Sequence, residues 1–137
     1  MNPILKNVIA LLLGWFIGAG VNMGLIYLGP QIIPPPANLD MTTLEGLKAG
    51  IPLLEFKHFV FPFLAHALGS LTGAFFAAKI AANRTRVLAM VIGIIFMLGG
   101  ISMARMVPQP TWFTLADLLL AYIPMAFIGW KLSGNRA

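Results

Sequence analysis

The stretch VLAMVIGIIFMLGGISMARMV, residues 87–107, decides the fold class of this chain, because Arg105 near its end is its only charged side chain. At about 1.5 Å per residue, a helix of this length covers the roughly 30 Å hydrocarbon core of a bilayer. Backbone groups facing lipid must find their hydrogen bonds within the segment. The stretch therefore predicts a transmembrane helix.

Three more apolar stretches flank it, at residues 5–28, 54–82 and 111–132. Of the 137 residues, 59% are hydrophobic and 9% are charged, against about 25% charged in soluble domains. The short connections 83–86 and 108–110 make consecutive helices antiparallel neighbours. We expect one all-α membrane domain over residues 1–137, an up-and-down bundle of four transmembrane helices.

The first stretch also has features of a cleavable secretory signal, namely Lys6, an apolar run and the small residues Gly18-Ala19-Gly20. The apolar run continues to Leu28, which is long enough to span a bilayer and favours a retained helix. Gly29-Pro30 is expected to end this helix, because proline fixes φ and lacks an N–H.

The non-cytoplasmic loop 29–53 is expected to be partly ordered. Pro34-Pro35-Pro36 favours an extended conformation. Thr42-Thr43-Leu44-Glu45 matches a capping box that would open a short helix, ended by Gly50 and Pro52. Its apolar residues are Leu44, Leu47 and Ile51, roughly on one side. We interpret it as an interfacial helix resting on the membrane, with a disordered loop as the open alternative.

Lysines and arginines indicate the orientation. With four spans, the termini and the 83–86 turn share one side, which carries Lys6, Lys79, Arg84, Arg86, Lys131 and Arg136. The other side carries Lys48, Lys57 and Arg105. This bias predicts cytoplasmic termini, and the absence of cysteine fits a bacterial inner (plasma) membrane.

The formal charge of +5 does not indicate nucleic-acid binding, because the bases cluster at the ends of apolar runs. There they are expected to contact anionic lipids at the cytoplasmic face. With no cysteine, disulfides, thiolate metal sites and thiol catalysis are excluded.

Glycines four residues apart allow close approach of helix backbones. The candidate packing glycines form three such pairs: Gly14 and Gly18, Gly20 and Gly24, and Gly69 and Gly73. They predict tight helix packing, and these glycine-rich faces would also support self-association as a homo-oligomer.

Asp117 is the one carboxylate well inside an apolar stretch. An acid at the centre of a membrane helix costs about 2.5–3.5 kcal/mol on insertion scales, so a partner is expected. Helix depth places Asn22 and Asp117 in the outer half, His66 near the middle, and His58 and Arg105 near the surface. We predict that Asp117 pairs with Arg105 across the 108–110 turn, with His66 and Asn22 nearby.

Two interpretations of this cluster remain open. Its polar side chains would either hold helices together, at about 0.6 kcal/mol per contact, or form a proton or cation relay through His66 and Asp117. In a relay, Pro62 and Pro124 would break helices at the depth where transporters place their sites.

Metal, cofactor and catalytic sites are not expected. His58 and His66 are about 12 Å apart along one helix, too far to share an ion. The chain has no zinc-protease, phosphate-loop or serine-hydrolase motif. We therefore expect a small membrane protein that is not an enzyme, acting as an accessory or interaction component. The alternative is a proton- or cation-coupled transporter or channel subunit.

A faint internal repeat relates the second and fourth apolar stretches. Leu64-Ala65-His66 aligns with Leu115-Ala116-Asp117, and Asn83-Arg84 aligns with Asn135-Arg136, with a one-residue shift in register between the two. A duplicated hairpin would produce this pattern. Convergence of two helices that end on the same side, where both need small residues followed by bases, is the explanation we favour.

Overall fold

The computed structural model describes residues 1–137 and contains helices but no strands, with 79% of residues helical. Four segments are long and apolar enough to cross a membrane. They are α1 (Pro3–Ile32), η2 (Phe56–Phe59) with α3 (Val60–Ile80), α4 (Thr85–Met106), and α5 (Thr111–Leu120) with α6 (Ile123–Ser133). The all-helical prediction is confirmed, and the four segments are compatible with a membrane location.

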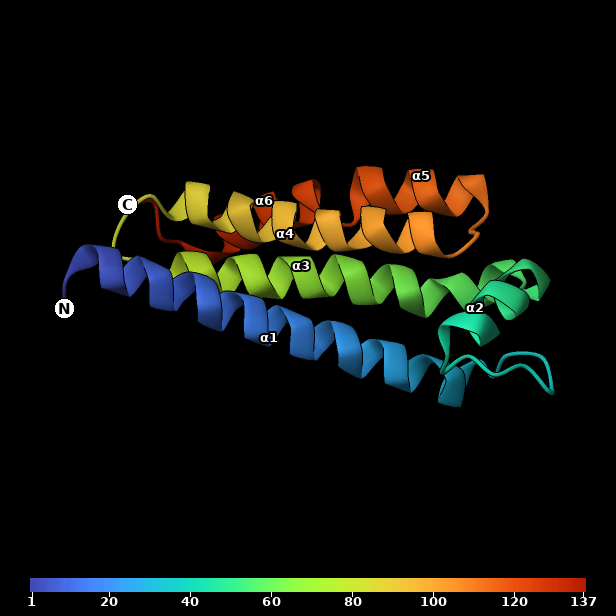
Figure 1. The fold of residues 1–137 in the computed structure, drawn as a ribbon. Coiled ribbons are helices and arrows are strands. Elements are labelled where there is room, and N and C mark those ends of the chain that lie inside the picture. Colours follow the sequence, from blue (N-terminus) through green and yellow to red (C-terminus); the bar gives the residue numbers. More distant parts are fainter.

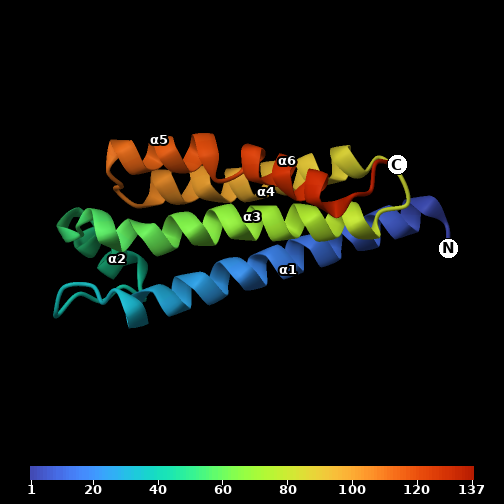
Figure 2. The same ribbon diagram turned by 180° about the vertical axis from the view of Figure 1, so that it is seen from behind.

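Helix α3 is the centre of the molecule. It packs along α1 on one side and against α4 and α6 on the other (Figures 1 and 2). Both chain termini lie at one end, which we call the terminal end (Figure 1). The short helix α2 (Leu44–Gly50) and the 3-10 helix η1 (Ile51–Leu53) lie at the opposite, loop end.

Glycine backbones set the distance between α1 and α3. A Cβ atom on Gly14 would lie 2.6 Å from the carbonyl oxygen of Gly73, and one on Gly18 would lie 2.6 Å from that of Gly69. Both distances are too short for any side chain, so the two helices touch through their backbones. Two of the three predicted glycine pairs therefore pack against each other within the chain.

The third pair, Gly20 and Gly24, faces away from the other helices. A Cβ atom on either residue would meet nothing within 4 Å. The same helix exposes large apolar side chains, with Phe16 at 63% and Met23 at 64% of their full accessibility. This face of α1 is unpartnered within the chain.

Helix α1 is longer than its sequence predicts. Asn2 caps its start, because its side-chain oxygen accepts a hydrogen bond from the Ile4 N–H at 2.8 Å. The helix then continues through Gly29-Pro30 to Ile32, so the predicted end at Leu28 is wrong. Proline in the last turn removes only one hydrogen bond, and the Ile33 N–H still reaches the Gly29 carbonyl at 2.8 Å.

The predicted helix in the first connection is present, but its cap differs by one residue. The Thr43 hydroxyl accepts a hydrogen bond from the Gly46 N–H at 3.0 Å and caps α2. The Thr42 hydroxyl instead donates to Asp40 Oδ1 at 2.6 Å. The predicted box between Thr42 and Glu45 does not form, because the Asp40 carboxylate already binds Thr42.

The apolar side of α2 packs onto the loop end of the bundle. Ile51 belongs to a buried cluster with Phe59, Val107 and Phe113, against which Leu44 and Leu47 of α2 are packed. Burial of these side chains holds the connection in place. The connection is thus folded against the bundle.

Prolines affect the second and fourth spans differently. The fourth span breaks at Ala121-Tyr122, just before Pro124, the second residue of α6. Pro124 has no N–H for the Leu120 carbonyl, so a continuous helix would lose a hydrogen bond there. Pro62 lies in the first turn of α3, where no backbone donor is needed, and the expected break is absent.

Polar contacts hold the C-terminal segment in place at the terminal end of the bundle. The Thr85 hydroxyl donates to the Asn135 carbonyl at 2.8 Å and accepts from the Trp130 Nε1–H at 3.1 Å. The Asn135 amide donates to the Ala78 carbonyl at 3.0 Å. The C-terminal segment is thereby joined to α3 and α4.

Candidate functional site

Asp117 and His66 form the main polar contact inside the bundle. Asp117 is 4% exposed, and its Oδ1 lies 2.7 Å from Nδ1 of His66 on α3. An ionised carboxylate can only accept hydrogen bonds, so Nδ1 of His66 is the donor. This assigns Nε2 of His66 as the nitrogen that remains available.

Tyr122 completes the site from the break between α5 and α6. Its hydroxyl donates to Asp117 Oδ2 at 2.7 Å, and its ring stacks on the His66 ring with 5.6 Å between centroids. In a continuous helix, a residue five positions later is rotated by about 140° and cannot face Asp117. The interruption before Pro124 therefore allows Tyr122 to bind Asp117.

Sequence reasoning missed Tyr122. It is one of only two tyrosines in the chain, and it lies just before a mid-span proline. A buried tyrosine hydroxyl normally has a hydrogen-bond partner, and Asp117 is the nearest acid in sequence. These two signals together could have identified it.

Gly100 of α4 provides the space for the Tyr122 hydroxyl. A Cβ atom at Gly100 would overlap that hydroxyl and lie 3.0 Å from the Tyr122 Cε2 atom. No side chain fits there unless the tyrosine moves. Gly100 thus belongs to the site although it carries no functional group.

The predicted pair of Asp117 with Arg105 is wrong. Arg105 is exposed, and the ion-pair partner of Asp117 is His66. Arg105 lies in the last turn of α4, where a long side chain reaches solvent. Asp117 lies about 9 Å further into the bundle, at 1.5 Å per residue from the start of α5.

Asn22 is near α3 but is not bonded to the acid. A Cβ atom added to Gly69 would lie 3.1 Å from the Cβ atom of Asn22. The side-chain oxygen of Asn22 is buried without a hydrogen-bond partner. Of the five predicted cluster residues, the structure joins only His66 and Asp117 directly.

His58 connects the start of the second span to the proline-rich connection. Its Nδ1 accepts a hydrogen bond from the Glu55 N–H at 2.9 Å, and its Nε2 lies 3.1 Å from the Pro34 carbonyl oxygen. The backbone N–H can only donate and the carbonyl can only accept, so Nε2 carries the proton and donates to Pro34. Both ring nitrogens are used, and His58 is a structural link.

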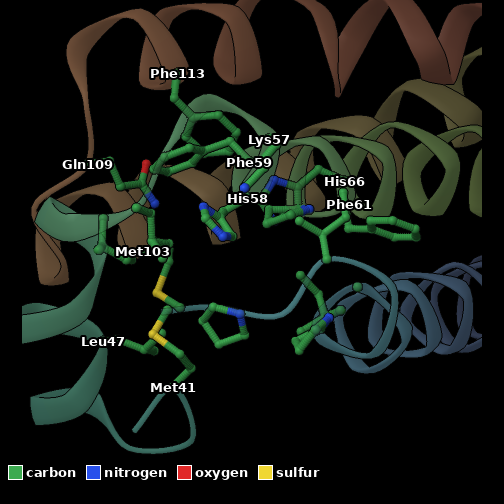
Figure 3. A pocket seen from close by; sticks show the side chains of 18 residues that line it. Met41, Leu47, Lys57, His58, Phe59, Phe61, His66, Met103, Gln109 and Phe113 are labelled. Atoms are coloured by element: carbon green, nitrogen blue, oxygen red, sulfur yellow. The ribbon is translucent and has the colours of Figure 1, made fainter. Parts of the chain in front are cut away.

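A cavity of about 250 Å³ lies at the loop end (Figure 3). Its walls come from the end of α1, the connection, the start of α3, the end of α4 and the start of α5. His66 lines it, so the polar site borders this space. A shallower groove of about 510 Å³, lined by Tyr27 and Asp40, shares Met41 with the cavity.

The cavity has the composition of a ligand site. Ten of its eighteen lining residues are hydrophobic, and the polar ones include Lys57, His58, His66 and Gln109. Binding sites for small molecules are typically apolar with a few converging polar groups, and span about 300–1,000 Å³. At about 250 Å³, this cavity is just below that range, so it suits a small ligand or one end of a longer one.

Comparisons with protein-family models, with curated proteins and with solved structures find no match to this chain. No group of three or more histidine, aspartate or glutamate side chains is placed to hold a metal ion. The functional inference therefore rests on the cavity and on the cluster of His66, Asp117 and Tyr122, of which His66 lines the cavity.

Proposed function

We propose that this chain works by binding rather than by catalysis, as an accessory or interaction component of a membrane. The cavity at the loop end is its binding site. The observation that carries this proposal is the His66–Asp117–Tyr122 cluster, which holds the His66 ring in the wall of a mostly apolar cavity. A positioned polar group in an apolar cavity is suited to orienting a ligand.

Packing in the terminal half of the bundle favours binding over transport. Ala77, Ala89 and Ala126 are fully buried there, in one cluster shared by α3, α4 and α6. A passage through this half would have to separate helices that touch through the backbones of Gly14 and Gly73. Close-packed interiors resist such separation.

Proton- or cation-coupled transport is the second candidate. Two observations favour it: a histidine and an acid, His66 and Asp117, are bonded to each other inside the bundle, and the fourth span is interrupted beside them at Tyr122. Broken helices near intramembrane acids are a feature of many transporter sites.

Proton flux distinguishes the two candidates. Purified protein would be reconstituted into vesicles loaded with a pH dye, and an external pH step imposed with and without a K⁺–valinomycin potential. Binding predicts the leak rate of empty vesicles for both the wild type and Asp117→Asn. A wild-type flux that Asp117→Asn abolishes, with the variant still folded, would overturn the binding proposal in favour of transport.

We further propose that the terminal end faces the cytoplasm of a bacterial inner membrane and contacts anionic lipids. Arg86 lies 5.5 Å from the Trp130 ring, and Lys131 lies 4.9 Å from the Phe127 ring. Bases beside aromatic rings suit the membrane interface.

Labelling of introduced cysteines tests this orientation. A cysteine at Ala49 should react with an impermeant maleimide added outside intact cells, whereas a cysteine at Ala137 should not. The reverse pattern would refute this orientation.

Self-association is the third part of the proposal. The open face of α1 around Gly20 and Gly24 has the spacing that lets two helices approach closely. A second copy of the chain would cover it.

A further inference from the structure

The polar groups that line the loop-end cavity share one chemical property. They are Lys57, His58, His66 and Gln109, and each carries nitrogen; no aspartate or glutamate lines the cavity (Figure 3). His58 already uses both ring nitrogens within the protein. The remaining three side chains are free to contact a ligand.

Gln109 presents a donor to the cavity. Its side-chain oxygen accepts a hydrogen bond from the Thr114 hydroxyl at 3.3 Å, which leaves the amide NH₂ group available. Lys57 has three N–H donors and no acceptor. Its ammonium group is 3.6 Å from Glu55, but its side chain is 59% exposed, so this pair is weak and exchangeable.

His66 adds a third donor when it is paired as an imidazolium with the Asp117 carboxylate. Asp117 is 4% exposed, and an imidazolium beside its carboxylate forms a pair that is neutral overall. Nδ1–H then binds Asp117, and Nε2–H is left to donate. Lys57 and Gln109 can therefore donate hydrogen bonds, and His66 can do so as an imidazolium. The net positive charge of the lining comes from Lys57.

The remaining walls are mostly apolar and contain two methionines. They include Met41, Leu47, Phe59, Met103 and Phe113. Methionine side chains adapt to irregular apolar shapes. Such walls suit a hydrocarbon body.

We propose that this cavity binds an anionic amphiphile, with an oxyanion head on Lys57, His66 and Gln109 and a hydrocarbon body against the apolar walls. This inference rests on the proposed binding function and specifies its ligand class. The charge of the lining groups selects an anion over a cation or a neutral alcohol. A carboxylate and a phosphate head both meet this requirement.

Equilibrium binding of radiolabelled decanoate tests the proposal, with the protein in nanodiscs and empty nanodiscs as the reference. Saturable binding is expected. Unlabelled decanoate and decyl phosphate should displace it, and their relative potency tells a fatty-acid ligand from a phosphate-headed one. Decanol and decyltrimethylammonium should displace it at least about tenfold less well, which corresponds to about 1.4 kcal/mol.

Two lysine variants serve as a matched pair. Lys57→Met should weaken decanoate binding by about fivefold, the effect of losing an exposed charge contact. Lys48→Met removes another exposed lysine, in α2, that does not line the cavity, and should leave the affinity unchanged. Met103→Trp, which places a larger side chain in the wall, should abolish binding while preserving the helical circular dichroism spectrum.

The outcomes separate failure of the ligand class from failure of the proposed function. Decanol binding as tightly as decanoate, or equal effects of Lys57→Met and Lys48→Met, would overturn the anionic ligand and leave a binding role intact. Absence of saturable binding by every probe would also overturn the anionic ligand. Only Asp117-dependent proton flux would overturn binding as the function.

Discussion

Position 100 shows how strongly one residue can constrain the polar site. Gly100 leaves room for the Tyr122 hydroxyl, which donates to Asp117, whose other oxygen binds His66. The arrangement satisfies both carboxylate oxygens in the interior of the bundle. A buried polar group that loses its partner costs about 1–3 kcal/mol, so each member depends on the others.

Gly100→Ala should therefore destabilise the protein by about 1–3 kcal/mol, because the added methyl group displaces the tyrosine. The measurement is reversible unfolding in mixed micelles. Gly99→Ala is the control, since a Cβ atom there meets nothing within 4 Å and should leave stability unchanged or raised. Equal losses in the two variants would refute the steric role of Gly100.

A double-mutant cycle tests which residue partners Asp117. His66→Ala and Asp117→Ala should show a coupling of about 0.5–3 kcal/mol, as expected for residues in contact. Arg105→Ala and Asp117→Ala should be additive within about 0.3–0.5 kcal/mol. Coupling in the second cycle but not in the first would restore the Arg105 pair.

Among the elements, α2 shows how local hydrogen bonds position a connection. Asp40 accepts hydrogen bonds from the Thr42 hydroxyl and from the Thr42 N–H at 2.9 Å. These bonds, chiefly the one from the Thr42 side chain, hold the pKa of Asp40 below its ordinary value of 3.8. The ionised carboxylate thus supports the turn that leads into the Thr43 cap.

We expect helix α2 to become less ordered at acid pH. Because the pKa of Asp40 is lower in the folded turn than in an unfolded chain, its support is complete above pH 3.8 and is lost as the pH falls through the lowered value. The chain has no cysteine, so a single spin label can be attached to a cysteine introduced at Ala49. This label should become more mobile as the pH falls through the lowered pKa of Asp40.

The matched control for this titration is Asp40→Asn with the same label. Its amide does not titrate, so label mobility should stay constant through the same pH range. A transition of equal size in the Asn variant would assign the change to another group.

At the scale of the whole molecule, residues that are aligned by the faint repeat lie next to each other in space. His66 and Asp117 align in the repeat, and they are bonded to each other across the bundle. The second and fourth spans run in the same direction, and their helices α3 and α6 are in contact (Figure 2). Side-by-side parallel spans bring aligned positions to similar depth, whether the likeness arose by duplication or by convergence.

The outward face of α1 leads to a prediction about assembly. Gly20→Leu should leave the fold intact and lower self-association, measured as energy transfer between donor- and acceptor-labelled copies in vesicles. Gly18→Leu should instead separate α1 from α3 and destabilise the fold, because a Cβ atom at this position would lie 2.6 Å from the Gly69 carbonyl oxygen. Unchanged energy transfer in Gly20→Leu would show that this face does not mediate assembly.

The sequence by itself determined the helical class, the approximate limits of the four spans and the presence of a short helix in the first connection. These properties are local, because apolar length and backbone hydrogen bonding decide them segment by segment. It also pointed to Asp117 and His66 as polar groups in apolar surroundings.

Only the tertiary structure decided which groups meet. Asp117 binds His66 and Tyr122 rather than Arg105, because helix register turns His66 inward, the break before Pro124 redirects Tyr122, and Arg105 reaches solvent from the end of α4. The cavity also depends on packing, since it is enclosed by segments far apart in the chain. Contacts of this kind depend on the relative rotation and depth of neighbouring helices, which hydropathy does not encode.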